Sequence, residues 1–206
     1  MKKTQEDAAI TREAILDAAR ACFYSAGFKN TSLDQIAKEA NVTRGAVYWH
    51  FKDKKDLFRE AVKDTFEANG GVVNYAHSLP IEYDYADRLY EVFWFAHGGN
   101  EGNNGDTQGV DFIYKAMIIA QNHDDDFQEV KELIQLEKLS LYRYFVEETR
   151  MQMRLKKIDN LDPEHYAGLL FIAFEGLFLM KGVKTGVADD KESIKNYIDL
   201  IIKDIV

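Results

Sequence analysis

The chain has 206 residues, of which 46% are hydrophobic and 30% charged, and its formal net charge is -9 at pH 7. This composition excludes a disordered chain and can fill a sizeable core. A single cysteine, Cys22, excludes an intramolecular disulfide and a cysteine-based metal cluster. Residues 1–60 hold 11 Lys and Arg against 9 Asp and Glu, whereas residues 61–206 hold 15 against 26, so the positive balance is confined to the N-terminal part.

The hydrophobic pattern is helical throughout, with only two prolines and no persistent strand-like alternation. It predicts an all-α protein of about nine helices. An N-terminal three-helix helix-turn-helix domain would span residues 1–53. A larger helical domain would span residues 54–206.

The N-terminus and the longest apolar run bear on localisation. The start, MKKTQEDAAI, has no apolar stretch, which argues against a secretory signal. The apolar run at 166–180 is too short for a bilayer and contains Glu175. We therefore expect a soluble, cytoplasmic protein with no membrane partner.

The first helix is expected over 11–26, where small and apolar residues share one face and Gly27 provides the stop. Ser32 followed by Gln35 is a capping-box signal for a second short helix. Asn41 suits the left-handed turn after that helix, and Thr43 is placed to cap the third. In the third helix Val47 and Phe51 share a face, and the three helices together predict a helix-turn-helix.

The rest of the chain predicts longer helices. Asp53 starts a fourth, expected to continue to about residue 76, and Asp162-Pro163-Glu164 is a strong helix start. The Gly/Asn-rich segment 98–109 is expected to be a mobile loop. Helices are expected near 84–97, 107–122, 125–157, 163–182 and 190–205, the third of them beginning at the acids Asp124, Asp125 and Asp126 and ending at Arg154, Lys156 and Lys157.

The segment TRGAVYWHF at 43–51 carries the chemistry expected for a DNA-contacting helix. The guanidinium of Arg44 matches guanine O6 and N7, and Gly45 and Ala46 allow the backbone to approach the groove floor. Hydroxyls, rings and a lysine nearby can contact phosphates. The candidate DNA-binding residues are Thr31, Ser32, Thr43, Arg44, Gly45, Ala46, Tyr48, Trp49, His50 and Lys54.

A packed corner of a helical domain is the alternative interpretation of this segment. We accept it for Val47 and Phe51, and it is the better account of Lys52 and Lys55 as a solvated face. It fails for the whole set, because a helix of about seven residues cannot hide the large polar and aromatic side chains while also burying Val47 and Phe51.

The run from Thr11 to Phe58 closely resembles the DNA-binding domain of TetR-family transcriptional regulators. The matching stretches are ILDAA, GF and TSLDQIAKEANVTRGAVYWHFKDKKDLF, and TRGAVYWHF looks most like the branch that includes the multidrug-efflux regulators. The resemblance implies an Ω-shaped homodimer that binds a palindromic double-stranded operator, usually as a repressor, and that a small molecule releases. It places Thr31, Thr43, Arg44, Tyr48, His50 and Lys54 at DNA.

Tyrosines and other aromatics crowd the segment 83–97 and continue at 112–117, which indicates a cavity lined partly by rings. Glu175 in an apolar helix needs a partner and, with the rings, suits a hydrophobic or aromatic effector that can also be cationic. For any one ring, ordinary core packing is the simpler account. The candidate ligand-binding residues are Phe66, Tyr90, Phe93, Trp94, Phe112, Met117, Phe174 and Glu175.

The helices 163–182 and 190–205 carry more apolar surface than one small core needs. By the resemblance, they pair with their copies in a four-helix dimer interface. The candidate interface residues are Tyr166, Leu170, Leu177, Ile198, Ile201 and Ile205.

We expect no cofactor, no metal and no enzymatic activity. His123 next to Asp124–Asp126 is better explained by acids at a helix start than by a metal site, and no catalytic motif occurs. A helical small-molecule carrier, or an enzyme using the aromatic cavity, is the alternative function, and a protein-interaction adaptor is a third. The carrier or enzyme leaves Arg44 and Lys54 without purpose, and the adaptor needs an acidic partner that meets the basic patch.

Overall fold

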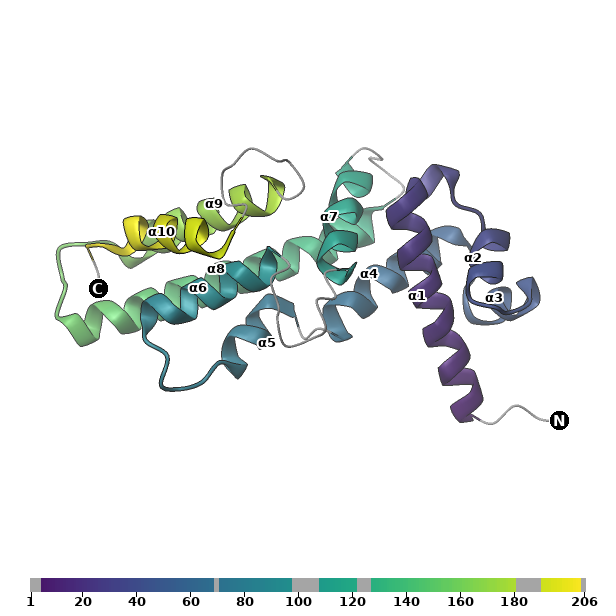
Figure 1. The fold of residues 1–206 in the computed structure, drawn as a ribbon, viewed down its shortest axis with the longest axis horizontal. Helices are drawn as coiled ribbons and strands as arrows, with labels where there is room; N and C mark the ends of the chain where they lie inside the picture. Colours follow the sequence, from purple (N-terminus) through teal and green to yellow (C-terminus); the bar gives the residue numbers. More distant parts are fainter. Residues whose placement is uncertain (1–4, 69–70, 98–107, 122–126, 181–189, 205–206) are drawn as a thin grey trace. The chain divides into compact units, whose positions relative to one another are not determined.

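The computed structural model describes residues 5–68, 71–97, 108–121, 127–180 and 190–204. All regular elements in these ranges are α-helices, which confirms the all-α class, and their number is close to that expected (Figure 1). The helices are α1 (Gln5–Asn30), α2 (Leu33–Glu39), α3 (Arg44–His50), α4 (Lys54–Ala68), α5 (Gly71–Ser78), α6 (Tyr85–Ala96), α7 (Gln108–Gln121), α8 (Gln128–Lys156), α9 (Pro163–Met180) and α10 (Lys191–Ile202).

The chain divides into two compact units. Unit 1 comprises residues 1–68 and 108–134, and unit 2 comprises residues 69–107 and 135–206. The functional-domain boundary predicted between residues 53 and 54 stays a prediction. No helix in the described part of the chain combines the length and apolar character needed to cross a membrane.

The helix starts and stops of unit 1 follow the local signals. Gly27 has φ 75° and ψ 166° and breaks α1 near its end. Ser32 and Gln35 form the complete capping box of α2, and Asn41 has φ 52° in the turn that follows. Thr43 Oγ1 accepts a hydrogen bond from the Ala46 amide at the start of α3. These contacts fix the turn between α2 and α3.

The fourth helix differs from its prediction. Asp53 Oδ1 accepts from the amides of Lys55 and Asp56, as expected for a helix start. However, α4 ends at Ala68 and α5 begins at Gly71. The φ angle of Gly71 is 64°, whereas residues within an α-helix have a negative φ. The predicted single helix to about residue 76 is therefore wrong. Most of the expected 98–109 loop and the acids Asp124–Asp126 lie outside the described residues.

An aromatic cluster forms the centre of unit 1. The Phe58 ring is fully buried and meets Phe23, Phe28 and Phe127 at centroid distances of 5.1, 5.4 and 5.2 Å. The Phe112 ring lies 6.0 Å from it. The angles between these rings are edge-on, the arrangement that aromatic quadrupoles favour. The cluster joins α1, α4, α7 and the residue before α8 into one core.

Ion pairs join α1 to α4 at the rim of this core. Arg12 Nη2 lies 2.6 Å from Glu60 Oε2, and Arg20 Nη1 lies 2.7 Å from Asp64 Oδ2. Both pairs are part-exposed, so each contributes little to stability, but together they orient α1 along α4.

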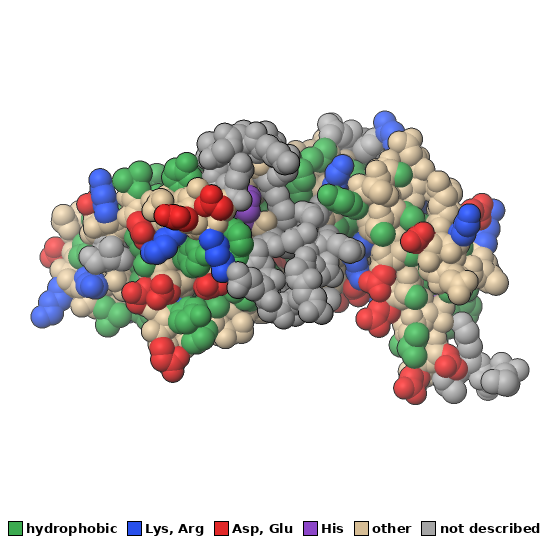
Figure 2. All heavy atoms as spheres, viewed as in Figure 1, with side chains coloured by type: hydrophobic (Ala, Val, Ile, Leu, Met, Phe, Trp, Pro, Cys, Tyr) green, Lys and Arg blue, Asp and Glu red, His purple; other side chains and the backbone are tan. Residues whose placement is uncertain are grey.

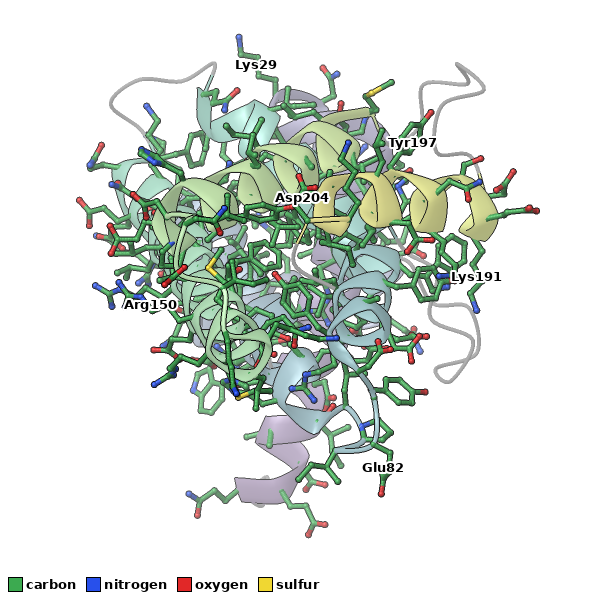
Figure 3. All side chains as sticks on the ribbon, turned by 90° about the vertical axis from the view of Figure 1, so that its left-hand side faces the viewer. Lys29, Glu82, Arg150, Lys191, Tyr197 and Asp204 are labelled. Atoms are coloured by element: carbon green, nitrogen blue, oxygen red, sulfur yellow. The ribbon has the colours of Figure 1, made fainter. Side chains whose placement is uncertain are left out.

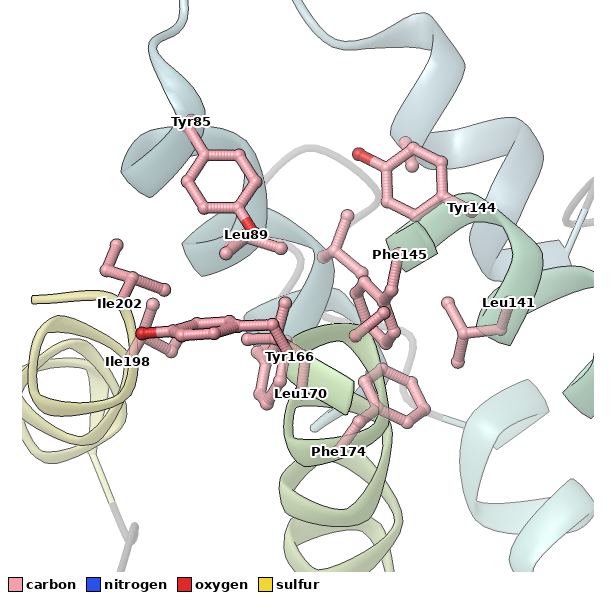
Figure 4. Packing of buried hydrophobic residues seen from close by; sticks show 14 of the residues in the cluster. Tyr85, Leu89, Leu141, Tyr144, Phe145, Tyr166, Leu170, Phe174, Ile198 and Ile202 are labelled. Carbon is pink, nitrogen blue, oxygen red and sulfur yellow. The ribbon is translucent and has the colours of Figure 1, made fainter. Parts of the chain in front are cut away.

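The core of unit 2 is built from α6, α8, α9 and α10. Figure 4 shows Leu170 and Phe174 of α9 among rings and aliphatic side chains of the neighbouring helices, with Ile198 and Ile202 of α10 beside Tyr166. Phe174 meets the Phe93 ring edge-on at 5.4 Å. These residues use the inward faces of α9 and α10, which decides what their outward faces can do.

Candidate nucleic-acid interface

Helix α3 is anchored on one face and exposed on the other. Val47 and the following Phe51 are buried. On the exposed face, Trp49 is 72% exposed and its ring meets His50 edge-on at 4.5 Å, and Tyr48 is also exposed. The helix therefore presents polar atoms and ring faces to solvent on a fixed support, as predicted.

The Arg44 guanidinium is exposed to solvent, but contacts with two side chains hold it in position. Its Nη2 donates to Tyr48 Oη at 3.2 Å, and its Cζ lies 5.4 Å from the centroid of the Tyr48 ring. Its Nη1 donates to Asp34 Oδ2 on α2, also at 3.2 Å. The hydrogen bond to Tyr48 and then the nearby negative charge of Asp34 raise the pKa of Arg44, which stays charged. Our sequence interpretation missed Asp34, although its ten-residue spacing from Arg44 across the turn could have suggested it.

Gly45 and the two capping hydroxyls surround Arg44. A Cβ added at Gly45 would meet only Thr43 Oγ1, at 3.8 Å, so the chain's own packing does not require a glycine there. Thr43 Oγ1 accepts from Ala46 and keeps its own proton to donate, whereas the Ser32 hydroxyl donates to Gln35 Oε1 at 3.0 Å. Ala46 is half-buried.

Thr31 is not on the surface, which corrects its assignment to DNA. Its side chain is buried, and Oγ1 donates to the carbonyl oxygens of Cys22 and Gly27, at 3.1 and 2.8 Å. These carbonyls lie where the break at Gly27 disrupts the hydrogen bonding of α1, and unsatisfied buried carbonyls are costly. Thr31 therefore has a structural role at the end of α1.

Lys54 is held by the same corner, which favours a structural role over its predicted role as an anion site. Nζ donates to the carbonyl oxygens of Phe28 and Thr31, at 2.8 and 2.7 Å, and lies 4.4 Å from the Phe28 ring centroid. Partial burial lowers its pKa from the ordinary value. The ammonium therefore links the end of α1 to the start of α4.

Replacing Lys54 by methionine is expected to lower the free energy of unfolding by about 1–2 kcal/mol. Hydrogen bonds from a charged donor contribute about 1.5–3 kcal/mol when buried, and less where water reaches them. The salt dependence of DNA binding should not change, whereas loss of a phosphate contact lowers the slope of log K against log salt by about 1. Urea titration and binding at several salt concentrations measure both quantities. Lys52→Met, at an exposed lysine, controls for the charge, and a reduced slope specific to Lys54→Met would restore the phosphate contact.

The predicted ligand residues are divided between the two units. Phe66, Phe112 and Met117 lie in unit 1, where Phe112 and Met117 are buried in the core. The other five lie in unit 2: Tyr90, Phe93, Trp94, Phe174 and Glu175. Phe93 and Phe174 pack against one another. The burial of Phe93, Phe112, Met117 and Phe174 favours core packing, and their contact with a ligand stays a prediction.

Trp94 and Glu175 of unit 2 carry polar atoms whose hydrogen-bond partners bear on ligand binding. Trp94 Nε1 is buried and has no hydrogen-bond acceptor among the described residues, which is costly unless an acceptor arrives. Glu175 has the partner that burial demanded, because Lys138 Nζ donates to its carboxylate. No group of three or more His, Cys, Asp and Glu suited to a metal occurs in the described ranges, and His123 lies outside them.

The predicted dimer residues are mostly internal. Tyr166, Leu170 and Ile198 are buried in the core of unit 2, Leu177 and Ile201 are half-buried, and Ile205 lies outside the described residues. A buried side chain cannot meet a partner chain, so the first three are corrected to core residues. Their helices instead expose other apolar side chains, namely Leu169, Ile172 and Leu179 on α9 and Tyr197 and Leu200 on α10.

The exposed residues of α9 follow a regular pattern. His165, Leu169, Ile172, Gly176 and Leu179 are spaced by four, three, four and three residues, the spacing of a helix seam. A Cβ at Gly176 would meet nothing within 4 Å. Tyr197, labelled in Figure 3, is exposed on α10. We call the exposed apolar residues of α9 and α10 the outer face.

Unit 1 thus defines a helix-turn-helix protein whose second motif helix carries an oriented arginine and exposed rings, the arrangement of a DNA-contacting helix. Residues 15–61 match the family model described as bacterial regulatory proteins, tetR family. The resemblance predicted from the sequence is confirmed for this segment.

Known regulators and solved structures are also similar to this chain. The HTH-type transcriptional regulator AcrR of Shigella flexneri is 44% identical over 91 residues, which cover 44% of this chain and 42% of that protein. The chain thus spans less than half the length of this relative. NalD, the secondary repressor of the MexAB-OprM multidrug efflux pump in Pseudomonas aeruginosa, has a TM-score of 0.66 and 24% identity over 98% of each chain. SmeT in complex with triclosan has a TM-score of 0.69 and 22% identity over 94% of this chain and 90% of SmeT. These two likenesses show the fold. AcrR is named as a transcriptional regulator and NalD as a repressor.

Proposed function

We propose that this chain is a cytoplasmic TetR-type transcriptional repressor. It binds a palindromic operator as a homodimer and is released by a small hydrophobic or aromatic effector. The observation that carries the proposal is Arg44, exposed and oriented at the start of α3 within the segment that matches the family. Gly45 supports the proposal. A glycine in a helix costs about 1 kcal/mol relative to alanine, and packing within the chain does not require one at this position. Close approach of the helix backbone to a DNA groove would explain the glycine.

The outer face supports the homodimer. Two copies of α9 and α10 can pair through these exposed apolar residues in a four-helix arrangement. Gly176 at the middle of the α9 seam allows two helix backbones to approach closely. A dimer with two-fold symmetry places two recognition helices on two half-sites, about 34–36 Å apart for adjacent turns of DNA.

The chemical class of the effector is inferred from side chains of unit 2. Tyr90 and Trp94 are half-buried rings, and the Trp94 N–H lacks an acceptor among the described residues, so an aromatic molecule with an oxygen acceptor suits this region. Because Lys138 already balances Glu175, a neutral effector is favoured over a cationic one. Release would be a population shift towards a dimer whose recognition helices no longer match the half-sites.

Replacing Arg44 by alanine tests the proposal. The operator affinity is expected to fall by roughly 5- to 150-fold, since one bidentate arginine–guanine pair discriminates by that factor, whereas affinity for random DNA falls far less. Fluorescence anisotropy measures both, on a duplex selected by the wild-type chain from random-sequence DNA and on a random duplex of equal length.

Arg44→Lys is the matched control, because it keeps the charge and removes the planar fork. It should retain binding to random DNA and lose the preference for the selected duplex. Equal losses on both duplexes for Arg44→Ala would refute contact with a base edge. A wild-type chain without preference for any selected sequence would refute the operator itself.

A further inference from the structure

An acidic side chain lies on the proposed DNA-contacting surface. Asp34 is 60% exposed and Arg44 61%, and their contact places the carboxylate beside the guanidinium. Figure 2 shows acidic and basic side chains next to one another at the α2–α3 end of unit 1. A carboxylate here repels DNA phosphates, so its position opposes the affinity that the neighbouring cation provides.

The number of donors on Arg44 suggests what Asp34 contributes. A guanidinium has five N–H donors. Asp34 takes one from Nη1 and Tyr48 takes one from Nη2, which leaves three. A guanine edge offers two acceptors, O6 and N7, so the held guanidinium can still contact guanine without leaving Asp34. A phosphate that draws the whole group toward the backbone must instead compete with the carboxylate.

We propose that Asp34 is a specificity-determining positioning residue for Arg44. It holds the guanidinium toward the base edges and competes with phosphates for it, so that the preference for operator over random DNA increases. The inference rests on the proposed function, because it assigns a role within the same DNA-contacting surface. Specificity obtained by weakening the wrong complex is a general strategy of binding proteins.

A simpler role for Asp34 must be separated from this one. It lies in the first turn of α2, where a carboxylate interacts favourably with the helix dipole. That role affects the stability of α2 and general affinity for DNA, but it does not alter the ratio of affinities for two duplexes. The ratio is therefore the quantity to measure.

The experiment compares Asp34→Asn with the wild-type chain on the selected and random duplexes described above. Affinity for the random duplex should rise more than affinity for the selected one, and their ratio should fall by at least about fivefold, the lower end of the discrimination given by one arginine–guanine pair. Glu39→Gln is the matched control: it removes one negative charge from an exposed position on the same helix, and its ratio should stay within about twofold of wild type. Circular dichroism confirms that each variant is folded.

A double-mutant cycle with Arg44→Ala decides whether Asp34 acts through Arg44. In the Arg44→Ala background, Asp34→Asn should leave the ratio unchanged. The inference is overturned if Asp34→Asn alone keeps the wild-type ratio, or if it lowers the ratio equally in both backgrounds. Absence of any preference in the wild-type chain would instead overturn the proposed function, and this inference with it.

Discussion

Replacing Ile172 by glutamate is expected to convert the protein to a monomer at micromolar concentration. Ile172 is 68% exposed in the middle of the outer face, and a two-fold interface would bring the carboxylate into an apolar contact. Because linked half-sites raise binding by a factor on the order of 10²–10⁴, operator affinity should fall by about 100-fold or more. Sedimentation velocity measures the oligomeric state, and anisotropy on the selected duplex measures the affinity.

Leu155→Glu is the control for the Ile172 substitution. Leu155 is 70% exposed near the end of α8, outside the outer face, and the chemical change is closely similar. This variant should keep the wild-type oligomeric state. A dimeric Ile172→Glu chain would show that α9 does not form the interface, and the search would then turn to the exposed apolar side chains of α8.

Replacing Phe58 by alanine should cost about 3–5 kcal/mol of stability, the largest effect expected within unit 1. Phe58 is fully buried and touches four other phenylalanine rings, so truncation leaves a cavity that its neighbours cannot fill without moving. Urea unfolding measures the loss. Hydrogen exchange shows where it falls, and protection should decrease in α1, α4 and α7 more than in α9 and α10.

Phe66→Ala provides the comparison for Phe58→Ala. It removes the same ring from the same helix, but Phe66 is only half-buried, so its cost should be clearly smaller. Equal costs for the two variants would contradict the view that the ring cluster around Phe58 organises unit 1.

Local signals predicted the helix-turn-helix well because each depends on one or two residues. The Ser32–Gln35 capping box, the left-handed Asn41 and the Thr43 cap are each determined by short-range hydrogen bonds or backbone sterics. The exposed face of α3 follows from the same logic, since burying Val47 and Phe51 turns the remaining side chains outward.

The dimer residues could not be selected from the sequence because α9 is apolar around most of its circumference. Periodicity finds a core face only when the opposite face is polar. Here Leu170 and Ile172 are equally apolar, yet the first is buried and the second exposed. Only the packing of α9 against α6, α8 and α10 separates the two sides.

Thr31 and Lys54 show a different limit of sequence reasoning. Their hydroxyl and ammonium groups are suited to phosphates, and the family resemblance placed both at DNA. The structure gives them backbone carbonyls at the end of α1 instead. These carbonyl oxygens need hydrogen-bond donors because α1 breaks at Gly27, and the residues that supply the donors lie 4 and 27 positions further along the chain.

Gly27 and Asn41 both have positive φ, but they differ in mutational tolerance. Asn41, with φ 52°, is in the left-handed helical region, where asparagine, aspartate and glycine are interchangeable at modest cost. Gly27 combines φ 75° with ψ 166°, a region that essentially only glycine occupies. A Cβ added at Gly27 would have free space around it, but the backbone conformation would still be strained for any other residue. Invariance at position 27 across related chains would therefore record a conformational requirement and carry no information about DNA or effector.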